Sequence, residues 1–183
     1  MKQALLIIDV QNDYFEGGAM TLVAPDQALS QINRLETYFV EQNLPVIYIQ
    51  HINPPEATFF RPNTSGVELH AGLKRQAHAI VIPKNKPNSF LNTSLEDTLK
   101  TLEIEQLVIT GMMTHMCIDS STRAAAERGY QPILIADATA TRDLTFEGHT
   151  TPADAVQHAF LSALTTFADV QSTAAFLQAH AAT

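Results

Sequence analysis

Short runs of consecutive apolar residues recur along the chain, and they constrain its fold more than any other feature. The five runs lie at residues 4–8, 45–49, 79–82, 107–110 and 132–136. A strand that is buried on both faces, as in a parallel sheet, has this continuous pattern. Between the runs, apolar residues recur at helical spacing, as Ile32, Leu35 and Phe39 do. This alternation predicts an α/β domain of three layers, with a mainly parallel sheet and right-handed crossovers.

We expect the predicted domain to be single and to span residues 1–183, because nothing in the sequence suggests a boundary. Residues 169–173 are expected to add a short edge strand before a terminal helix, and residues 181–183 are expected to fray. Residues 142–151 are polar, and we expect them to form a loop. Residues 50–70 contain three prolines and are interpreted as a long surface excursion of the kind that is often functional.

Composition argues against several classes of partner. The formal net charge is −8, from 11 basic and 19 acidic residues. We therefore expect no nucleic-acid partner and no association with anionic membrane surfaces. The apolar run after Lys2 is too short for the core of a signal peptide, and no run reaches membrane-spanning length. A single cysteine cannot form an intramolecular disulfide, so it stays free in a reducing compartment or bridges two chains. We therefore expect a cytoplasmic protein.

Three reactive side chains follow predicted strands. Asp9 follows the first run, Lys84 follows the third, and Cys117 lies just past the fourth, where a helix begins. Because parallel strands end at one edge of a sheet, these side chains are expected to converge. A nearby lysine and a helix N-terminus favour the thiolate, so we expect a reactive Cys117 thiolate well below pH 8. Asp9 has the chemistry to take the thiol proton and return it to a leaving amine.

Each of these residues also has a structural interpretation. A lone cysteine is usually a small buried hydrophobe, and an aspartate at a strand end is often a hydrogen-bond anchor. Most lysines are solvated at the surface, and under the structural interpretation Lys84 is one of them. Three compatible groups at equivalent strand ends favour the functional interpretation.

Further motifs accompany these three residues. They are LIIDVQND at residues 6–13, Lys84 followed six residues later by Phe90, GMMTHMC at residues 111–117, Thr122 with Ala124 and Ala125, and Asp137 with Ala138. In this order and spacing, nearly the whole chain resembles the isochorismatase-like cysteine hydrolases, the superfamily that includes nicotinamidases and N-carbamoylsarcosine amidases. The resemblance implies a doubly wound sheet with strand order 3-2-1-4-5-6 and helices on both faces. It also implies a homodimer or a larger homo-oligomer.

The resemblance implies that Asp9, Lys84 and Cys117 form a catalytic triad. Lys86 competes for the role of the lysine, but Lys84 has the family's spacing to Phe90. In the implied reaction, Cys117 attacks an amide or ureido carbonyl, a thioester forms with release of an amine or ammonia, and water activated by Asp9 hydrolyses the thioester.

The resemblance also implies a cis peptide bond between Met112 and Met113. In the family this bond turns one backbone N–H toward the oxyanion of the intermediate. The implied oxyanion hole therefore consists of the backbone N–H groups of Met113 and Cys117.

The substrate pocket is less well defined by the sequence. Four side chains are expected to line it, namely Phe15, Phe60, Phe90 and His115. Nicotinamidases of the family bind a metal through an Asp-x-His motif after the second strand, with a further histidine. Here residues 50–55 read QHINPP, and His51 is the one plausible ligand. We therefore expect no metal and no other cofactor.

The sequence predicts a metal-independent cysteine hydrolase that cleaves a C–N bond of a small amide, carbamoyl or ureido compound. Two alternatives stay open. An isochorismatase-type enzyme cleaves a vinyl ether and needs no thiol, so Cys117 favours C–N hydrolysis over that reaction. A catalytically idle member would act as an oligomeric binding module or a thiol sensor. The intact set of Asp9, Lys84 and Cys117 argues against an idle protein.

Overall fold

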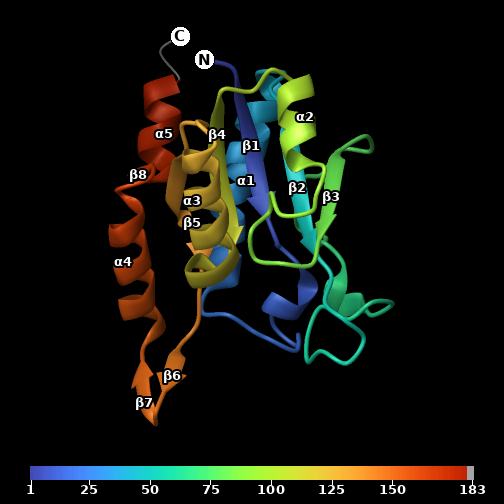
Figure 1. The fold of residues 1–183 in the computed structure, drawn as a ribbon, viewed down its shortest axis with the longest axis vertical. Coiled ribbons are helices and arrows are strands. Elements are labelled where there is room, and N and C mark those ends of the chain that lie inside the picture. Colours follow the sequence, from blue (N-terminus) through green and yellow to red (C-terminus); the bar gives the residue numbers. More distant parts are fainter. Residues whose placement is uncertain (181–183) are drawn as a thin grey trace.

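A parallel sheet forms the centre of the structure, a computed structural model that describes residues 1–180 (Figure 1). Its six strands are β1 (Gln3–Ile8), β2 (Val46–His51), β3 (Ile80–Lys84), β4 (Gln106–Met112), β5 (Ile133–Ala140) and β8 (Asp169–Gln171). They pair in the order β3-β2-β1-β4-β5-β8, and all neighbours are parallel. The predicted doubly wound order is confirmed, with β8 as the expected edge strand. The fraying expected for residues 181–183 lies outside the described residues.

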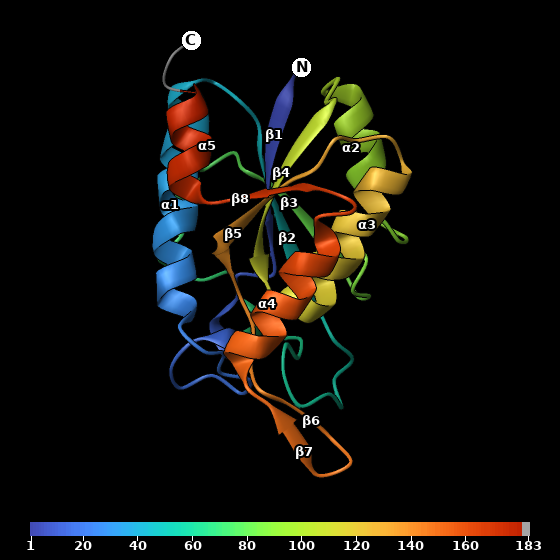
Figure 2. The ribbon, with the colours of Figure 1, turned by 90° about the vertical axis from the view of Figure 1, so that its left-hand side faces the viewer.

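Helices cover both faces of this sheet, as predicted. Helices α1 (Pro25–Glu41) and α5 (Thr173–His180) lie on one face, and α2 (Leu95–Thr101), α3 (Asp119–Glu127) and α4 (Ala153–Leu164) lie on the other (Figure 2). Strand β1 is fully buried between them, so its alternate side chains enter two different cores. Leu5 and Ile7 pack into the core on the α1 side, while Leu6 and Ile8 pack into the core beneath α2 and α3. Within residues 1–180, no helix has the length and apolarity that crossing a membrane requires.

The prediction of a loop for residues 142–151 is wrong. Strands β6 (Leu144–Phe146) and β7 (His149–Thr151) pair there as an antiparallel hairpin that extends beyond the sheet (Figure 1). The two residues between them, Glu147 and Gly148, both have positive φ angles, of 49° and 77°. That backbone conformation is the one required by the tightest hairpin turns. Each strand has only three residues, which is too few for an alternating pattern to stand out from a polar loop.

Gly111 lets strands β1 and β4 come together at the edge of the sheet where both strands end. It pairs with Ile8 and has a φ angle of 119°, in a region that side-chain-bearing residues rarely adopt. A side chain at this position would collide with the backbone of Ile8. Asp9 follows Ile8 directly, and the turn that carries Cys117 follows β4. The glycine therefore brings the two chain segments that hold Asp9 and Cys117 side by side.

Candidate active site

Asp9, Lys84 and Cys117 meet at the carboxyl ends of β1, β3 and β4. Lys84 Nζ lies 2.8 Å from Asp9 Oδ2 and donates a hydrogen bond to Cys117 Sγ at 3.1 Å. The exposed fractions of the three residues are 0%, 4% and 4%, so the cluster is shielded from solvent. A charge this deeply buried is tolerated only when it is paired, as Asp9 and Lys84 are here. The side chain of Lys86 is exposed, and this residue contributes its backbone carbonyl to Lys84 at 3.1 Å.

Asp9 has a free acceptor. Its Oδ1 is buried and has no hydrogen-bond partner among residues 1–180, while Oδ2 forms the ion pair with Lys84. The residue also has a φ angle of 54°, a left-handed conformation that aspartate tolerates better than most residues. Asp9 thus combines one oxygen that is held by a cation with another that is available to a proton.

Cys117 lies in a π-helical turn, Thr114–Ile118, that leads directly into α3. Such turns occur often at functional sites. The peptide bond between Met112 and Met113, just before this turn, is cis, at the position that the resemblance implies. The sequence placed Cys117 at a corner between strand and helix, and the structure agrees. The oxyanion hole formed by the N–H groups of Met113 and Cys117 stays a prediction.

The protonation of Cys117 differs from the expectation. Burial raises the pKa of the thiol, the Asp9 carboxylate raises it further, and Lys84 only partly opposes them. A thiolate well below pH 8 was therefore the wrong expectation, because it counted the cation and the helix but not the burial or the carboxylate. Burial lowers the pKa of Lys84, but Asp9 and Cys117 outweigh it, and the pKa is raised. At neutral pH the cluster accordingly holds an ammonium and a protonated thiol.

His51, at the end of β2, is the fourth side chain of the cluster. Its Nδ1 lies 2.9 Å from Lys84 Nζ, 3.8 Å from Asp9 Oδ2 and 4.0 Å from Cys117 Sγ. Sequence reasoning considered His51 only as a remnant of a metal site. No signal in the sequence shows that its ring turns toward the predicted triad.

The fit of a metal ion at this position can be tested against the side chains. Asp9, His51 and Cys117 offer three ligand atoms within 4.8 Å of one another, and zinc accepts such a set. However, Lys84 Nζ lies within 3.1 Å of an atom of each, so a metal ion would have to displace it. The family's Asp-x-His positions are occupied here by His51 and Asn53, which bond to each other at 2.8 Å. These residues do not fit the metal site of the nicotinamidases.

Two polar residues of the segment after β1 organise the loops around the cluster. Gln11 Nε2 donates to the carbonyls of His51 and Val67 at 2.8 and 2.7 Å, and its Oε1 accepts from His51 N at 2.8 Å. Asp13 Oδ2 accepts from Phe60 N at 2.6 Å. Both side chains are buried, and their partners are backbone groups. Gln11 and Asp13 therefore support the site by fixing the backbone that carries His51 and Phe60.

Two of the predicted pocket residues, Phe15 and Phe60, lie in the loops that follow β1 and β2. The ring of Phe60 packs on Tyr14 with centroids 4.6 Å apart, and it lies 6.0 Å from the ring of His51. Phe15 stacks on His70 at 3.9 Å. Both phenylalanines are buried. Their contact with substrate stays a prediction.

The other two predicted pocket residues lie on either side of α3. Phe90 stacks with Tyr130 and lies beneath the guanidinium of Arg128, near the carboxyl end of this helix. His115 lies in the π-helical turn before the helix, and its Nδ1 is 2.6 Å from Thr141 Oγ1. His115 is thus two residues from Cys117, whereas Phe90 packs near the opposite end of α3. A role in substrate binding stays a prediction for both.

Arg142 is a residue near the site that sequence reasoning missed. Its Nε is buried without a hydrogen-bond partner among the described residues. Burial and the Asp9 carboxylate raise the pKa of Tyr14, and the charge of Arg142 opposes this rise. Burial lowers the pKa of His115, and Arg142 lowers it further. Arg142 comes just after β5, as Asp9 comes just after β1, so its position at a strand end was the signal that could have identified it.

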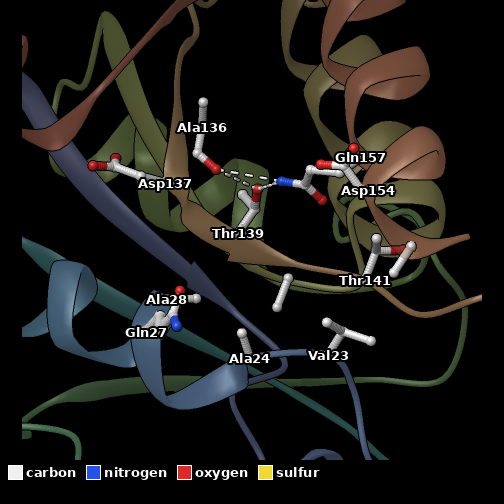
Figure 3. A pocket seen from close by; sticks show the side chains of 12 residues that line it. Val23, Ala24, Gln27, Ala28, Ala136, Asp137, Thr139, Thr141, Asp154 and Gln157 are labelled. Carbon is white, nitrogen blue, oxygen red and sulfur yellow. Dashed lines mark hydrogen bonds between the residues drawn. The ribbon is translucent and has the colours of Figure 1, made fainter.

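A separate cavity of about 340 Å³ lies beside β5, between the amino ends of α1 and α4 (Figure 3). Figure 3 shows the amide of Gln157 pointing at Thr139, to which it donates at 2.8 Å. The oxygen of the same amide accepts from Thr114 Oγ1 at 2.7 Å, which ties α4 to the π-helical turn that carries Cys117. None of Asp9, Lys84 and Cys117 lines this cavity. It is therefore a neighbour of the site and not the site itself.

Comparisons with known proteins agree with this geometry. The model of the isochorismatase domain matches residues 3–175. The uncharacterised isochorismatase family protein YddQ of Bacillus subtilis strain 168 is 43% identical over 180 residues, covering 97% of this chain and 100% of that protein. A crystal structure from Oleispira antarctica, ascribed to the isochorismatase hydrolases, is 42% identical, with a TM-score of 0.93. It covers 97% of this chain and 96% of that one.

A more distant relative has a named activity. The ureidoacrylate amidohydrolase RutB of Pseudomonas savastanoi pv. phaseolicola is 28% identical over 170 residues, covering 74% of this chain and 69% of that protein. With its sheet order, its domain match and these relatives, the chain belongs to the isochorismatase family of hydrolases.

Proposed function

We propose that this protein is a metal-independent cysteine hydrolase that cleaves a C–N bond in a small amide, carbamoyl or ureido compound. The observation that carries the proposal is the buried contact of one ammonium, Lys84, with both Asp9 and Cys117. Similarity to an amidohydrolase supports the same reaction class. The expected cytoplasmic location and homo-oligomeric assembly belong to this proposal, and they rest on composition and on the resemblance.

The first half of the reaction forms a thioester. Cys117 Sγ attacks the substrate carbonyl carbon, and the thiol proton passes to Asp9, whose free Oδ1 is available to accept it. Lys84 stabilises the negative charge on sulfur as it develops, and the N–H groups of Met113 and Cys117 donate to the oxyanion. When the tetrahedral intermediate collapses, the C–N bond breaks. Asp9 then returns its proton to the leaving nitrogen, and the acyl group stays on sulfur.

The second half regenerates the enzyme. Asp9 takes a proton from a water molecule, whose oxygen attacks the thioester carbonyl. The C–S bond breaks, the acid product leaves, and the proton held by Asp9 returns to Cys117. Because the pKa of Cys117 is raised, the resting thiol needs this carboxylate in every cycle. The pairing of Cys117 with a base favours C–N hydrolysis over vinyl-ether cleavage, because vinyl-ether cleavage requires no sulfur nucleophile.

A screen of small amides, carbamates and ureas for release of ammonia or amine tests this proposal. The purified protein is expected to hydrolyse members of this panel, and Cys117→Ala is expected to lower the rate by at least about 10³-fold. The panel includes a vinyl ether of the isochorismate type as the competing substrate. Hydrolysis that survives in Cys117→Ala, or turnover of the vinyl ether alone, would contradict the proposed reaction.

A further inference from the structure

The ammonium of Lys84 has more acceptors around it than protons to give. It carries three N–H groups, but four acceptors lie within 3.1 Å. They are Asp9 Oδ2 at 2.8 Å, His51 Nδ1 at 2.9 Å, Lys86 O at 3.1 Å and Cys117 Sγ at 3.1 Å. The two shortest contacts are with Asp9 and His51, so these two residues determine the direction in which the ammonium points. The mechanism above leaves His51 without a role.

The tautomer of His51 follows from its second contact. His51 Nε2 lies 2.8 Å from Asn53 Oδ1. Asn53 Nδ2 donates to the carbonyl of Phe59 at 3.1 Å, which turns the amide so that its oxygen faces the ring. An amide oxygen only accepts, so Nε2 carries the proton and Nδ1 presents a lone pair to Lys84. A neutral imidazole in this tautomer is the form that fits both contacts.

We propose that His51 is a positioning residue for the catalytic lysine. As the neutral Nε2–H tautomer it holds the Lys84 ammonium between Asp9 and Cys117, and its protonation releases that hold. A protonated ring would direct an N–H at the ammonium 2.9 Å away. It would also compete with Lys84 for Asp9 Oδ2, which is 3.8 Å from Nδ1. The catalytic consequence rests on the proposed function, but the hydrogen-bond arrangement does not.

The charged groups that face the ring determine the direction of the pH effect. They are Asp9 just after β1, Lys84 at the end of β3 and Lys86 two residues beyond it, and the protonated thiol of Cys117 also faces the ring. Burial lowers the pKa of His51, and the two lysines lower it further, while Asp9 opposes them. The ring is therefore neutral at pH 7. The reactivity of Cys117 is expected to fall more steeply than the loss of thiolate alone requires as the pH drops below the ordinary histidine pKa of ~6.5 and the ring takes up a proton.

Nitrogen-15 NMR of the histidine rings in the unmodified protein tests the arrangement without any substrate. His51 is expected to give the pattern of the Nε2–H tautomer at pH 7 and to titrate with a midpoint below ~6.5. His158 is the internal reference, because its side chain is 78% exposed. A protonated ring at pH 7, or the Nδ1–H tautomer, would overturn the inference. Neither result would bear on amide hydrolysis, so the two proposals fail separately.

Two substitutions test the positioning role through the rate of Cys117 alkylation by iodoacetamide, measured between about pH 5 and 9. In His51→Asn, the amide oxygen replaces Nδ1 as an acceptor but does not titrate. In His51→Leu, the acceptor is lost. We expect His51→Leu to slow alkylation at neutral pH by up to about 10²-fold. Alkylation of every variant falls with the thiolate fraction as the pH drops, so the comparison is between the additional declines below ~6.5. His51→Asn is expected to retain most of the rate and to lack the additional decline, and His158→Asn to behave as the parent protein does.

The pattern across these variants separates positioning from packing. If His51→Asn is as slow as His51→Leu, the ring acts through its shape and the inference is wrong. If both variants match the parent protein at every pH, Lys84 does not depend on His51 and the inference is equally wrong. Thermal unfolding of each variant is measured as a control, so that alkylation rates are compared only between folded proteins.

Discussion

Replacing Asp9 by asparagine is expected to lower C–N hydrolysis by about 10²- to 10⁴-fold, the usual contribution of a general base. Asparagine fits the same space but cannot take the proton of Cys117. The same substitution removes the negative charge that helps to raise the pKa of the thiol. We therefore expect the midpoint of Cys117 alkylation against pH to move down while hydrolysis is lost. The reactivity of the thiol at neutral pH is thus expected to rise in the same variant in which hydrolysis falls.

Thermal unfolding of Asp9→Asn distinguishes a base from a structural anchor. A base is lost from a protein that still folds, whereas loss of an anchor would abolish hydrolysis together with the cooperative unfolding transition. Asp154→Asn is the matched control, because the Asp154 side chain is 89% exposed on α4. It is expected to change neither quantity. Full hydrolysis in Asp9→Asn would remove Asp9 from the mechanism.

Replacing Lys84 by methionine is expected to lower the free energy of unfolding by about 3–5 kcal/mol, the cost of leaving a buried charge without its partner. Asp9 is fully buried, and its ion pair with Lys84 spans 2.8 Å. Because the pKa of Lys84 is raised, this contribution is present at neutral pH and is lost only as the pH rises above ~10.5, so denaturant unfolding at neutral pH measures it. Hydrolysis is expected to be lost as well.

The double variant Asp9→Asn/Lys84→Met supplies the sharper comparison. With both charges removed, no unpaired charge stays buried, and the protein is expected to be more stable than Lys84→Met alone. Lys100→Met is the control, because Lys100 forms an exposed pair with Glu96 and its loss is expected to have little effect. If Lys84→Met unfolds no more easily than Lys100→Met, the buried ion pair is not a stabilising feature.

The sheet and the meeting of Asp9, Lys84 and Cys117 could be predicted because both follow from strong local patterns. Continuous apolar runs identify buried parallel strands, and parallel strands end at one edge. Asp9, Lys84 and Cys117 each follow such a run, so their meeting required no knowledge of side-chain conformations. The hairpin at residues 144–151 escaped prediction because its strands are too short for a clear alternation.

Other features of the site depend on contacts that no local pattern contains. The pKa of Cys117 is raised because its sulfur is buried beside Asp9, and sequence alone shows neither the depth nor the distance. The role proposed for His51 depends on the orientation of the Asn53 amide, which is held by a backbone carbonyl six residues further on. These features depend on tertiary contacts between side chains, and the positions of residues at strand ends do not reveal such contacts.

The central claim is that Cys117 carries the acyl group of the substrate. Once the screen has identified a substrate, acid quenching during turnover and mass spectrometry of the digested protein test it most directly. We expect the peptide that contains Cys117 to gain the mass of the acyl group while substrate is present and to lose it when substrate is consumed. Steady hydrolysis with this peptide unmodified, or with the added mass on another residue, would contradict the account.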